Sequence, residues 1–155
     1  MTAGRRTILA PLSGRVLPLA AVPDPVFSGG MMGPGVAIEP DGDVAVAPAD
    51  GVLAVLHSAG HAFAIQTPDG LEILVHIGLD TVKLKGRGFS VVRARGDHVA
   101  AGEVIVRFDR DLIQREGYRL ISPIVVPTVP QGSALTFVDV PHVEAGEVLG
   151  WLHRQ

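Results

Sequence analysis

Cysteine is absent from the 155 residues of this chain. Without a thiol, the chain forms no disulfide, no thiolate metal site and no cysteine nucleophile of its own. Basic residues are also few: 13 lysines and arginines stand against 16 aspartates and glutamates, and the net charge is −3. Nucleic-acid binding usually needs a clustered basic surface, so this balance argues against a nucleic-acid partner. No apolar run reaches the ~18 residues of a membrane span. We therefore expect a soluble, cytoplasmic protein without direct membrane insertion.

Glycine and proline, in contrast, are abundant, with 19 and 12 residues. They separate short apolar runs rich in valine and isoleucine, which is typical of an all-β domain. The expected strands are Thr7–Ala10, Val44–Ala47, Gly51–Leu56, Ala62–Gln66, Leu71–Ile77, Val104–Phe108 and Val148–Leu152. One helix is expected over Arg110–Glu116, between a capping Asp109 and Gly117. No linker-like composition marks a second domain, so residues 1–155 are predicted to form one domain.

Two patterns occur twice. Ala10-Pro-Leu-Ser-Gly14 is similar to Ala47-Pro-Ala-Asp-Gly51, and His98-Val-Ala-Ala-Gly-Glu-Val-Ile105 is similar to His142-Val-Glu-Ala-Gly-Glu-Val-Leu149. β-Hairpins reuse the same turn residues, and such reuse would explain either pair. The alternative is a duplicated β-motif that forms a sandwich. The second pair favours duplication, because a whole strand-turn-strand pattern recurs.

The segment between His61 and His76 is the most informative. Thr67-Pro-Asp-Gly70 is a strong turn signal between two apolar stretches. A turn that closes symmetrically about its two central residues pairs His61 with His76, with Cβ atoms ~5 Å apart. The same register places four more residues on the histidine face: Phe63, Ile65, Leu74 and Glu72. A slip of one residue would break this pairing.

Two opposed histidines suit phosphoryl transfer. A neutral imidazole nitrogen serves as nucleophile, general base or metal ligand near neutral pH. A second imidazole can orient the first or stabilise charge added to it. Either histidine alone is more simply explained as a half-exposed strand residue. The pairing favours a function, as does Gly78, which lacks a Cβ and would let a partner's backbone approach.

Several motifs carry a family resemblance. Leu74-Val-His-Ile-Gly-Leu-Asp-Thr-Val82 and Gly60-His-Ala-Phe63 resemble the two active-site motifs of the glucose-type IIA components of the bacterial phosphoenolpyruvate-dependent sugar phosphotransferase system. Ile8-Leu-Ala-Pro-Leu-Ser-Gly14 resembles the first strand and turn of that family, and the resemblance covers nearly the whole chain. It implies an antiparallel β-sandwich of duplicated hybrid-motif type with one or two short helices, which agrees with the composition.

The resemblance also implies roles for individual residues. His76 matches the histidine that is phosphorylated at Nε2, and His61 matches the histidine that assists transfer. Asp24 and Asp80 match acidic residues that meet an arginine of the donor protein. Phe27, Leu74 and Val82 match an apolar rim where partners dock, and the hairpin register adds Phe63 to that exposed patch.

The implied function is that of a phosphoryl carrier in sugar uptake. The phosphohistidine carrier HPr would donate a phosphoryl group to His76. A cysteine of a sugar-specific IIB domain, partnered by a IIC permease, would then accept that phosphoryl group from His76. That cysteine must lie on another chain. In-line transfer between protein nucleophiles requires no cofactor, although His61 and His76 could share a zinc ion with a partner's carboxylate. Glucose, N-acetylglucosamine and β-glucosides all remain open as the sugar.

Two positions depart from the family pattern. Ala59 stands where threonine is common, two residues before the first histidine, so a hydrogen bond that orients His61 is missing or supplied differently. His57 stands where an aromatic residue is common in the apolar rim.

Two other functions fit less well. A zinc hydrolase on a similar β-fold needs three protein ligands and a His-x-His motif, and the corresponding stretch here is His76-Ile-Gly78. A biotinyl- or lipoyl-type carrier needs a lysine at an exposed hairpin tip, a setting that Lys83 and Lys85 lack.

Overall fold

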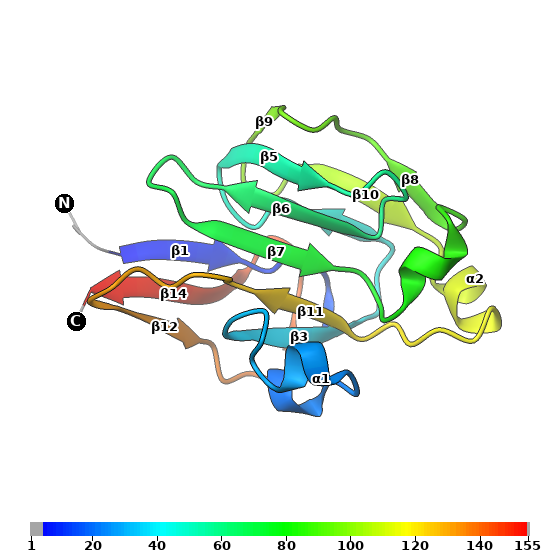
Figure 1. Ribbon diagram of the computed structural model, residues 1–155, viewed down its shortest axis with the longest axis horizontal. Helices are drawn as coiled ribbons and strands as arrows, with labels where there is room; N and C mark the ends of the chain where they lie inside the picture. The colour runs from blue at the N-terminus through cyan, green and yellow to red at the C-terminus, as the bar shows by residue number, and fades with distance from the viewer. Residues whose placement is uncertain (1–4, 155) are drawn as a thin grey trace.

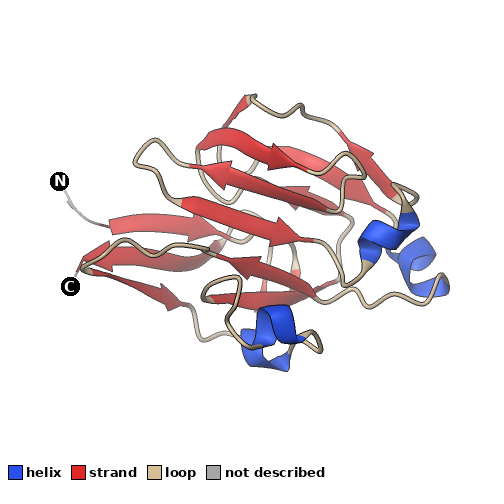
Figure 2. Cartoon of the chain, in the orientation of Figure 1, coloured by secondary structure: helices blue, strands red, loops and turns tan. Residues whose placement is uncertain are grey.

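The computed structural model describes residues 5–154 and shows an antiparallel β-sandwich with short helices (Figures 1 and 2). The strands are β1 (Arg5–Leu9), β2 (Gly14–Pro18), β3 (Gly35–Pro40), β4 (Val44–Val46), β5 (Gly51–Leu56), β6 (Ala62–Gln66), β7 (Glu72–His76), β8 (Phe89–Val91), β9 (His98–Val99), β10 (Val104–Phe108), β11 (Ser122–Val125), β12 (Ser133–Phe137), β13 (His142–Val143) and β14 (Val148–Arg154). The α-helices are α1 (Pro25–Ser28) and α2 (Arg110–Arg115), and the 3-10 helices are η1 (Leu19–Ala21) and η2 (Thr81–Leu84). The predicted fold class is therefore confirmed.

The strands form one large sheet and two small ones. The large sheet has the order β13-β2-β3-β11-β7-β6-β5-β9, and the small sheets have the orders β1-β14-β12 and β4-β10-β8. Along β7, Ile73 and Val75 are fully buried, whereas Leu74 and His76 are partly exposed. This alternation places one face of β7 on the core and leaves the other face to carry His76. Figure 1 shows β7 running toward the end of the molecule where η2 and α2 lie, away from the start of β1.

Each strand expected from the sequence is present, and so is helix α2. The Asp109 carboxylate accepts a hydrogen bond from the Leu112 N–H at 3.1 Å and caps the first turn. Gly117, with φ of 92°, follows the last turn. Within residues 5–154, no helix is long and apolar enough to cross a membrane.

The repeated sequence patterns occupy equivalent places in the large sheet. Strand β13 pairs with β2, and β9 pairs with β5 in the same antiparallel way. The Ala145 N–H donates to the Ser13 hydroxyl at 2.8 Å, and the Ala101 N–H donates to the Asp50 carboxylate at 2.7 Å. Ser13 and Asp50 hold the same position in the first repeated pattern. Because reuse of turn residues would not reproduce contacts between distant segments, the structure favours the duplicated motif.

The hairpin of β6 and β7 has a register one residue away from the predicted one. Ala62, not His61, lies opposite His76, and Phe63 lies opposite Val75. The predicted cross-strand pairing of the two histidines is therefore wrong. Phe63 has moved to the core face and is fully buried. Ile65 moves with it, while Leu74 stays on the face of His76.

Proline explains the slip. A two-residue hairpin turn requires a positive φ at its first central residue, and Pro68 is locked near −65°. The loop therefore contains three residues. The Gly70 N–H donates to the Thr67 carbonyl at 2.9 Å, and the Thr67 N–H donates to the Leu71 carbonyl at 2.8 Å. Gly70 takes the left-handed conformation, with φ of 90°, that such a loop needs at its last position.

A second apolar cluster lies on the opposite face of β3 from the main core. Ala37 belongs to this cluster, whereas its neighbours Val36 and Ile38 belong to the main core. Helix α1 packs there through Phe27. Its first turn is capped by Asp24, whose carboxylate accepts the Val26 N–H at 3.0 Å. This packing brings α1 beside the end of β7.

Candidate functional site

His61 reaches His76 from just outside the paired strands. The His61 carbonyl accepts the Ile77 N–H at 2.7 Å, so His61 lies opposite the residue that follows β7. Because His61 lies outside the paired strands, the alternation of side chains along β6 does not determine the direction of its side chain. The two imidazole centroids lie 5.2 Å apart at 74°. The predicted contact between the histidines is therefore present, although the register that predicted it is not.

One hydrogen bond sets the tautomer of His76. Its Nδ1 lies 2.6 Å from the carbonyl oxygen of Gly78. A carbonyl only accepts, so Nδ1 must carry the proton, and the neutral ring keeps its lone pair on Nε2. Burial lowers the pKa of His76, while the Gly78 carbonyl and the charges of Asp24 and Asp80 oppose this. The ring is therefore neutral at neutral pH and keeps an unprotonated Nε2.

The Gly78 carbonyl is itself held in place. The Gly78 N–H donates to the Ser122 hydroxyl at 3.0 Å, and that hydroxyl donates to the Leu120 carbonyl at 2.7 Å. With φ of 72°, a Cβ at position 78 would lie 2.8 Å from the Arg119 carbonyl oxygen and 2.7 Å from Thr81 Cγ2. The space beside Gly78 is thus filled by the chain itself. The glycine is needed for internal packing, which corrects the expectation that it leaves room for a partner's backbone.

His61 is buried, with 4% of its surface exposed. Within the described residues, its Nδ1 has no hydrogen-bond partner, in agreement with the expectation drawn from Ala59. Burial lowers the pKa of His61 to about 4, and charge on His76 and His57 adds to this. His61 is therefore neutral near pH 7.

His57, which stands at a rim position in the family pattern, is exposed, and its ring also lies against His61. The two ring centroids are 4.2 Å apart at 57°. The Nδ1 of His57 accepts the Ala59 N–H at 3.1 Å. Phe89 approaches His61 more distantly, with ring centroids 6.5 Å apart. His61 is therefore surrounded by three rings.

The predicted apolar rim is less exposed than expected. The Phe27 ring lies 5.4 Å from His76, but only 7% of the residue is exposed. Leu74 is partly buried and packs with Phe27 in the cluster under α1. Val82, in η2, is 46% exposed. With Phe63 in the core, Val82 is the most open of the four predicted rim residues, and the prediction of an exposed patch is wrong for Phe27 and Phe63.

Sequence reasoning missed the parts of the site that depend on distant backbone. Gly78 and Ser122 are 44 residues apart, and no pattern in the sequence links them. The contact between His57 and His61 was also missed. A short Gly-containing turn between two histidines is a signal that could have suggested it.

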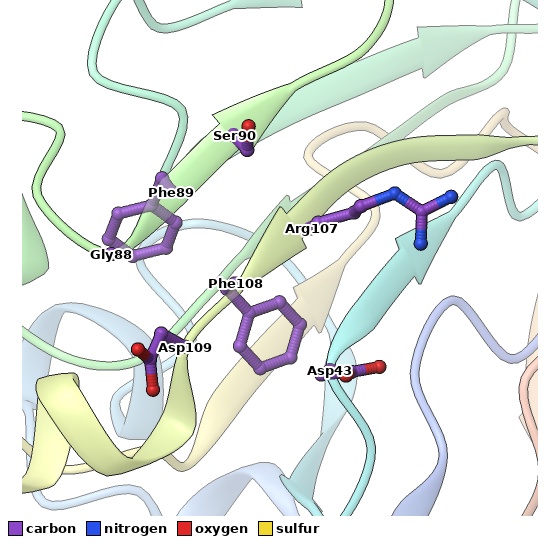
Figure 3. Close-up of a pocket in the computed structure, with 7 residues that line it drawn as sticks. All are labelled: Asp43, Gly88, Phe89, Ser90, Arg107, Phe108 and Asp109. Atoms are coloured by element: carbon purple, nitrogen blue, oxygen red, sulfur yellow. The ribbon is translucent and has the colours of Figure 1, made fainter.

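A surface pocket of about 350 Å³ lies near the site but does not include the histidines (Figure 3). It is lined by Asp43, Gly88, Phe89, Ser90, Arg107, Phe108 and Asp109. Phe89 is the lining residue that also approaches His61. The pocket is open and flanks β8 and β10, so we do not assign it to the histidine pair.

Within residues 5–154, no group of three or more histidine, aspartate or glutamate side chains is arranged to hold a metal ion. A zinc hydrolase needs three protein ligands. Two histidines alone would need a further ligand from another molecule.

Comparisons with known proteins show the family of this chain. Residues 6–132 match the family model of the phosphoenolpyruvate-dependent sugar phosphotransferase system, EIIA 1. Over 120 residues the chain is 47% identical to the glucose-specific EIIA component of Bacillus cereus. These aligned residues cover 77% of this chain and 73% of that protein. The glucose permease IIA from Mycoplasma capricolum superposes with a TM-score of 0.91 at 36% identity, over 97% of each chain.

Some relatives are much longer. The mannose-specific EIIBCA component of Corynebacterium glutamicum is 48% identical over 119 residues, which cover 77% of this chain and 17% of that protein. The glucose-specific EIIBCA component of Corynebacterium glutamicum is 43% identical over 140 residues, or 90% of this chain and 20% of the relative. The chain thus spans about a fifth of the length of these two relatives.

Proposed function

Because the chain belongs to the glucose-type EIIA 1 family of the phosphoenolpyruvate-dependent sugar phosphotransferase system, we propose that it accepts a phosphoryl group from HPr on His76 and passes it to a cysteine of a sugar-specific IIB domain. The observation that carries this proposal is the 2.6 Å hydrogen bond from His76 Nδ1 to the Gly78 carbonyl. It leaves Nε2 with a free lone pair, as an in-line attack on phosphorus requires.

Two transfers follow from this arrangement. In the first, the His76 Nε2 lone pair attacks the phosphorus of the donor's phosphohistidine, a new N–P bond forms, and the donor's N–P bond breaks as its imidazole leaves. In the second, the IIB thiolate attacks the same phosphorus and the bond to Nε2 breaks. Positioning and charge stabilisation provide most of the catalysis in such transfers, and neither step requires a metal ion or nucleotide.

His61 assists by stabilising the phosphoryl group. Its ring lies 5.2 Å from the ring of His76 and is neutral before transfer. The negative charge of a phosphoryl group on His76 would favour the protonated form of His61, because an opposite charge nearby raises the pKa of a histidine. His61 would then donate a hydrogen bond to a phosphoryl oxygen during transfer.

The relatives support the identity of the acceptor. Their names join EIIA to EIIB and EIIC in one polypeptide, and this chain contains no cysteine that could serve as the acceptor. The relatives are named for mannose, glucose and β-glucosides. Identity to them therefore does not select one sugar.

A labelling and chase experiment tests the proposal. Purified protein is incubated with ³²P-labelled HPr and then chased with a IIB domain. His76→Gln should take up no label. His61→Gln should take up label, more slowly, and pass it on poorly. The exposed His98 provides a matched control, and His98→Gln should behave as the unaltered chain. Normal labelling of His76→Gln would refute the assignment of the acceptor, and normal transfer by His61→Gln would remove His61 from the mechanism.

A further inference from the structure

Three histidine rings lie in a row at the site. His57 is 4.2 Å from His61, and His61 is 5.2 Å from His76, measured between ring centroids. Among residues 5–154, hydrogen bonds fix the outer two rings only: His76 to the Gly78 carbonyl and His57 to the Ala59 N–H. The middle ring, His61, lacks such a bond at its buried Nδ1 within the described residues.

This difference matters because an imidazole has two flipped orientations. A half-turn of the ring exchanges each nitrogen with a carbon, and hydrogen bonds usually select the correct orientation. At His61, packing must make that selection instead. Among the rings around His61, His57 is nearer than His76 or Phe89.

His57 is suited to this task because its own position is fixed. Its backbone N–H donates to the Ala62 carbonyl at 2.9 Å, and its carbonyl accepts the Gly60 N–H at 2.8 Å. Its Nδ1 accepts the Ala59 N–H at 3.1 Å within the same short turn. The His57 ring is thus held from both its backbone and its side chain, and it lies against the His61 ring at a tilt of 57°.

We propose that His57 is a positioning residue for His61: its anchored ring holds the His61 imidazole in the orientation that makes Nε2 available to a phosphoryl group on His76. The inference rests on the proposed function of His61 and His76. His57 acts through the shape of its ring and does not touch the transferred group. A planar ring is therefore what position 57 requires, and the second nitrogen of histidine is not.

Three substitutions separate ring shape from hydrogen bonding. His57→Phe keeps a flat ring and loses the acceptor for the Ala59 N–H. His57→Asn keeps a short-range acceptor and loses the ring. His57→Leu fills the space without a flat ring. It serves as a second ringless variant in case the Asn variant folds poorly. Thermal unfolding of each variant establishes that it is folded before transfer is measured.

Two readouts are needed. In the unphosphorylated protein, NMR of the histidine side chains reports the tautomer of His61 and its ring contact with His76. With labelled HPr and a IIB domain, the rates of labelling and of chase are measured separately. We expect the Phe variant to keep the ring contact and chase within about twofold of the unaltered chain. The Asn and Leu variants should lose the contact and chase about tenfold more slowly, through kcat and not KM, while labelling changes less than threefold.

The outcomes are distinct. A Phe variant that fails as the Asn and Leu variants do would overturn the proposal, because the hydrogen bond would then be the requirement. Ringless variants that keep both the contact and the chase rate would also overturn it. If the unaltered chain accepts no phosphoryl group from HPr, the proposed function fails, and the NMR contact still decides whether His57 positions His61.

Discussion

Replacement of Gly78 by alanine would test how the chain holds the acceptor histidine. The residue has a φ of 72°, a conformation that costs a residue with a Cβ roughly 1–2 kcal/mol. The added Cβ would also lie 2.8 Å from the Arg119 carbonyl oxygen. That oxygen accepts the Leu79 N–H at 3.0 Å, so it cannot move away without stretching a hydrogen bond. Relief of such an overpacked contact costs roughly 1–3 kcal/mol.

The two effects together give a loss of about 2–5 kcal/mol in the free energy of unfolding. Gly70→Ala, in the loop of the β6–β7 hairpin, is a matched control. Gly70 has a φ of 90°, but a Cβ there would meet no atom within 4 Å. Gly70→Ala should therefore cost only the conformational part, about 1–2 kcal/mol. Urea denaturation at a common pH measures both losses, and unchanged m-values would show that the transitions are comparable.

Gly78→Ala should also slow labelling of His76. A backbone shift at position 78 moves the carbonyl that binds His76 Nδ1–H. Loss of a hydrogen bond with a net value of about 1 kcal/mol slows the reaction about fivefold. Gly70→Ala, far from this bond, should label at the normal rate. The reasoning is refuted if Gly78→Ala is no less stable than Gly70→Ala, or if folded Gly78→Ala labels normally.

Three further predictions concern His61, Phe63 and Val82. The pKa of His61 is about 4 in the folded chain, against 6.5 in the unfolded one, so the unfolded chain binds the proton first as pH falls. Protonation of His61 should therefore lower the free energy of unfolding by up to about 3 kcal/mol between pH 6.5 and pH 4. Denaturation across that pH range should show a smaller loss of stability in His61→Gln than in the unaltered chain. An equal loss in both would contradict the lowered pKa of His61. Phe63→Ala should cost about 3–5 kcal/mol because the ring is fully buried, and a loss under 1 kcal/mol in urea denaturation would contradict the register. Val82 is 46% exposed, so Val82→Arg should change the free energy of unfolding by less than about 0.5 kcal/mol. The same substitution should slow labelling by HPr severalfold, and an unchanged labelling rate would remove Val82 from the docking surface.

The sequence by itself determined the type and place of many elements. Strand alternation, turn residues and helix caps are local signals, and these act between residues a few positions apart. Helix α2 illustrates this, since Asp109 and Gly117 mark its ends in the sequence and in the structure. The hairpin between His61 and His76 also followed from a local turn signal, whereas the contact between their rings depends on His61 lying just outside the paired strands. The repeated patterns left open a duplicated motif, which the equivalent contacts at Ser13 and Asp50 in the structure favour.

The tertiary structure alone decided which side of the sheet each residue occupies and what holds the site together. One extra loop residue at Gly70 moved Phe63 from the histidine face into the core, because side chains alternate with a period of two. The support of Gly78 by Ser122 joins segments 44 residues apart. The burial of Phe27 depends on how α1 packs against the sheet. Such contacts follow from the way whole strands and helices pack, and a local pattern of residue types does not determine that packing.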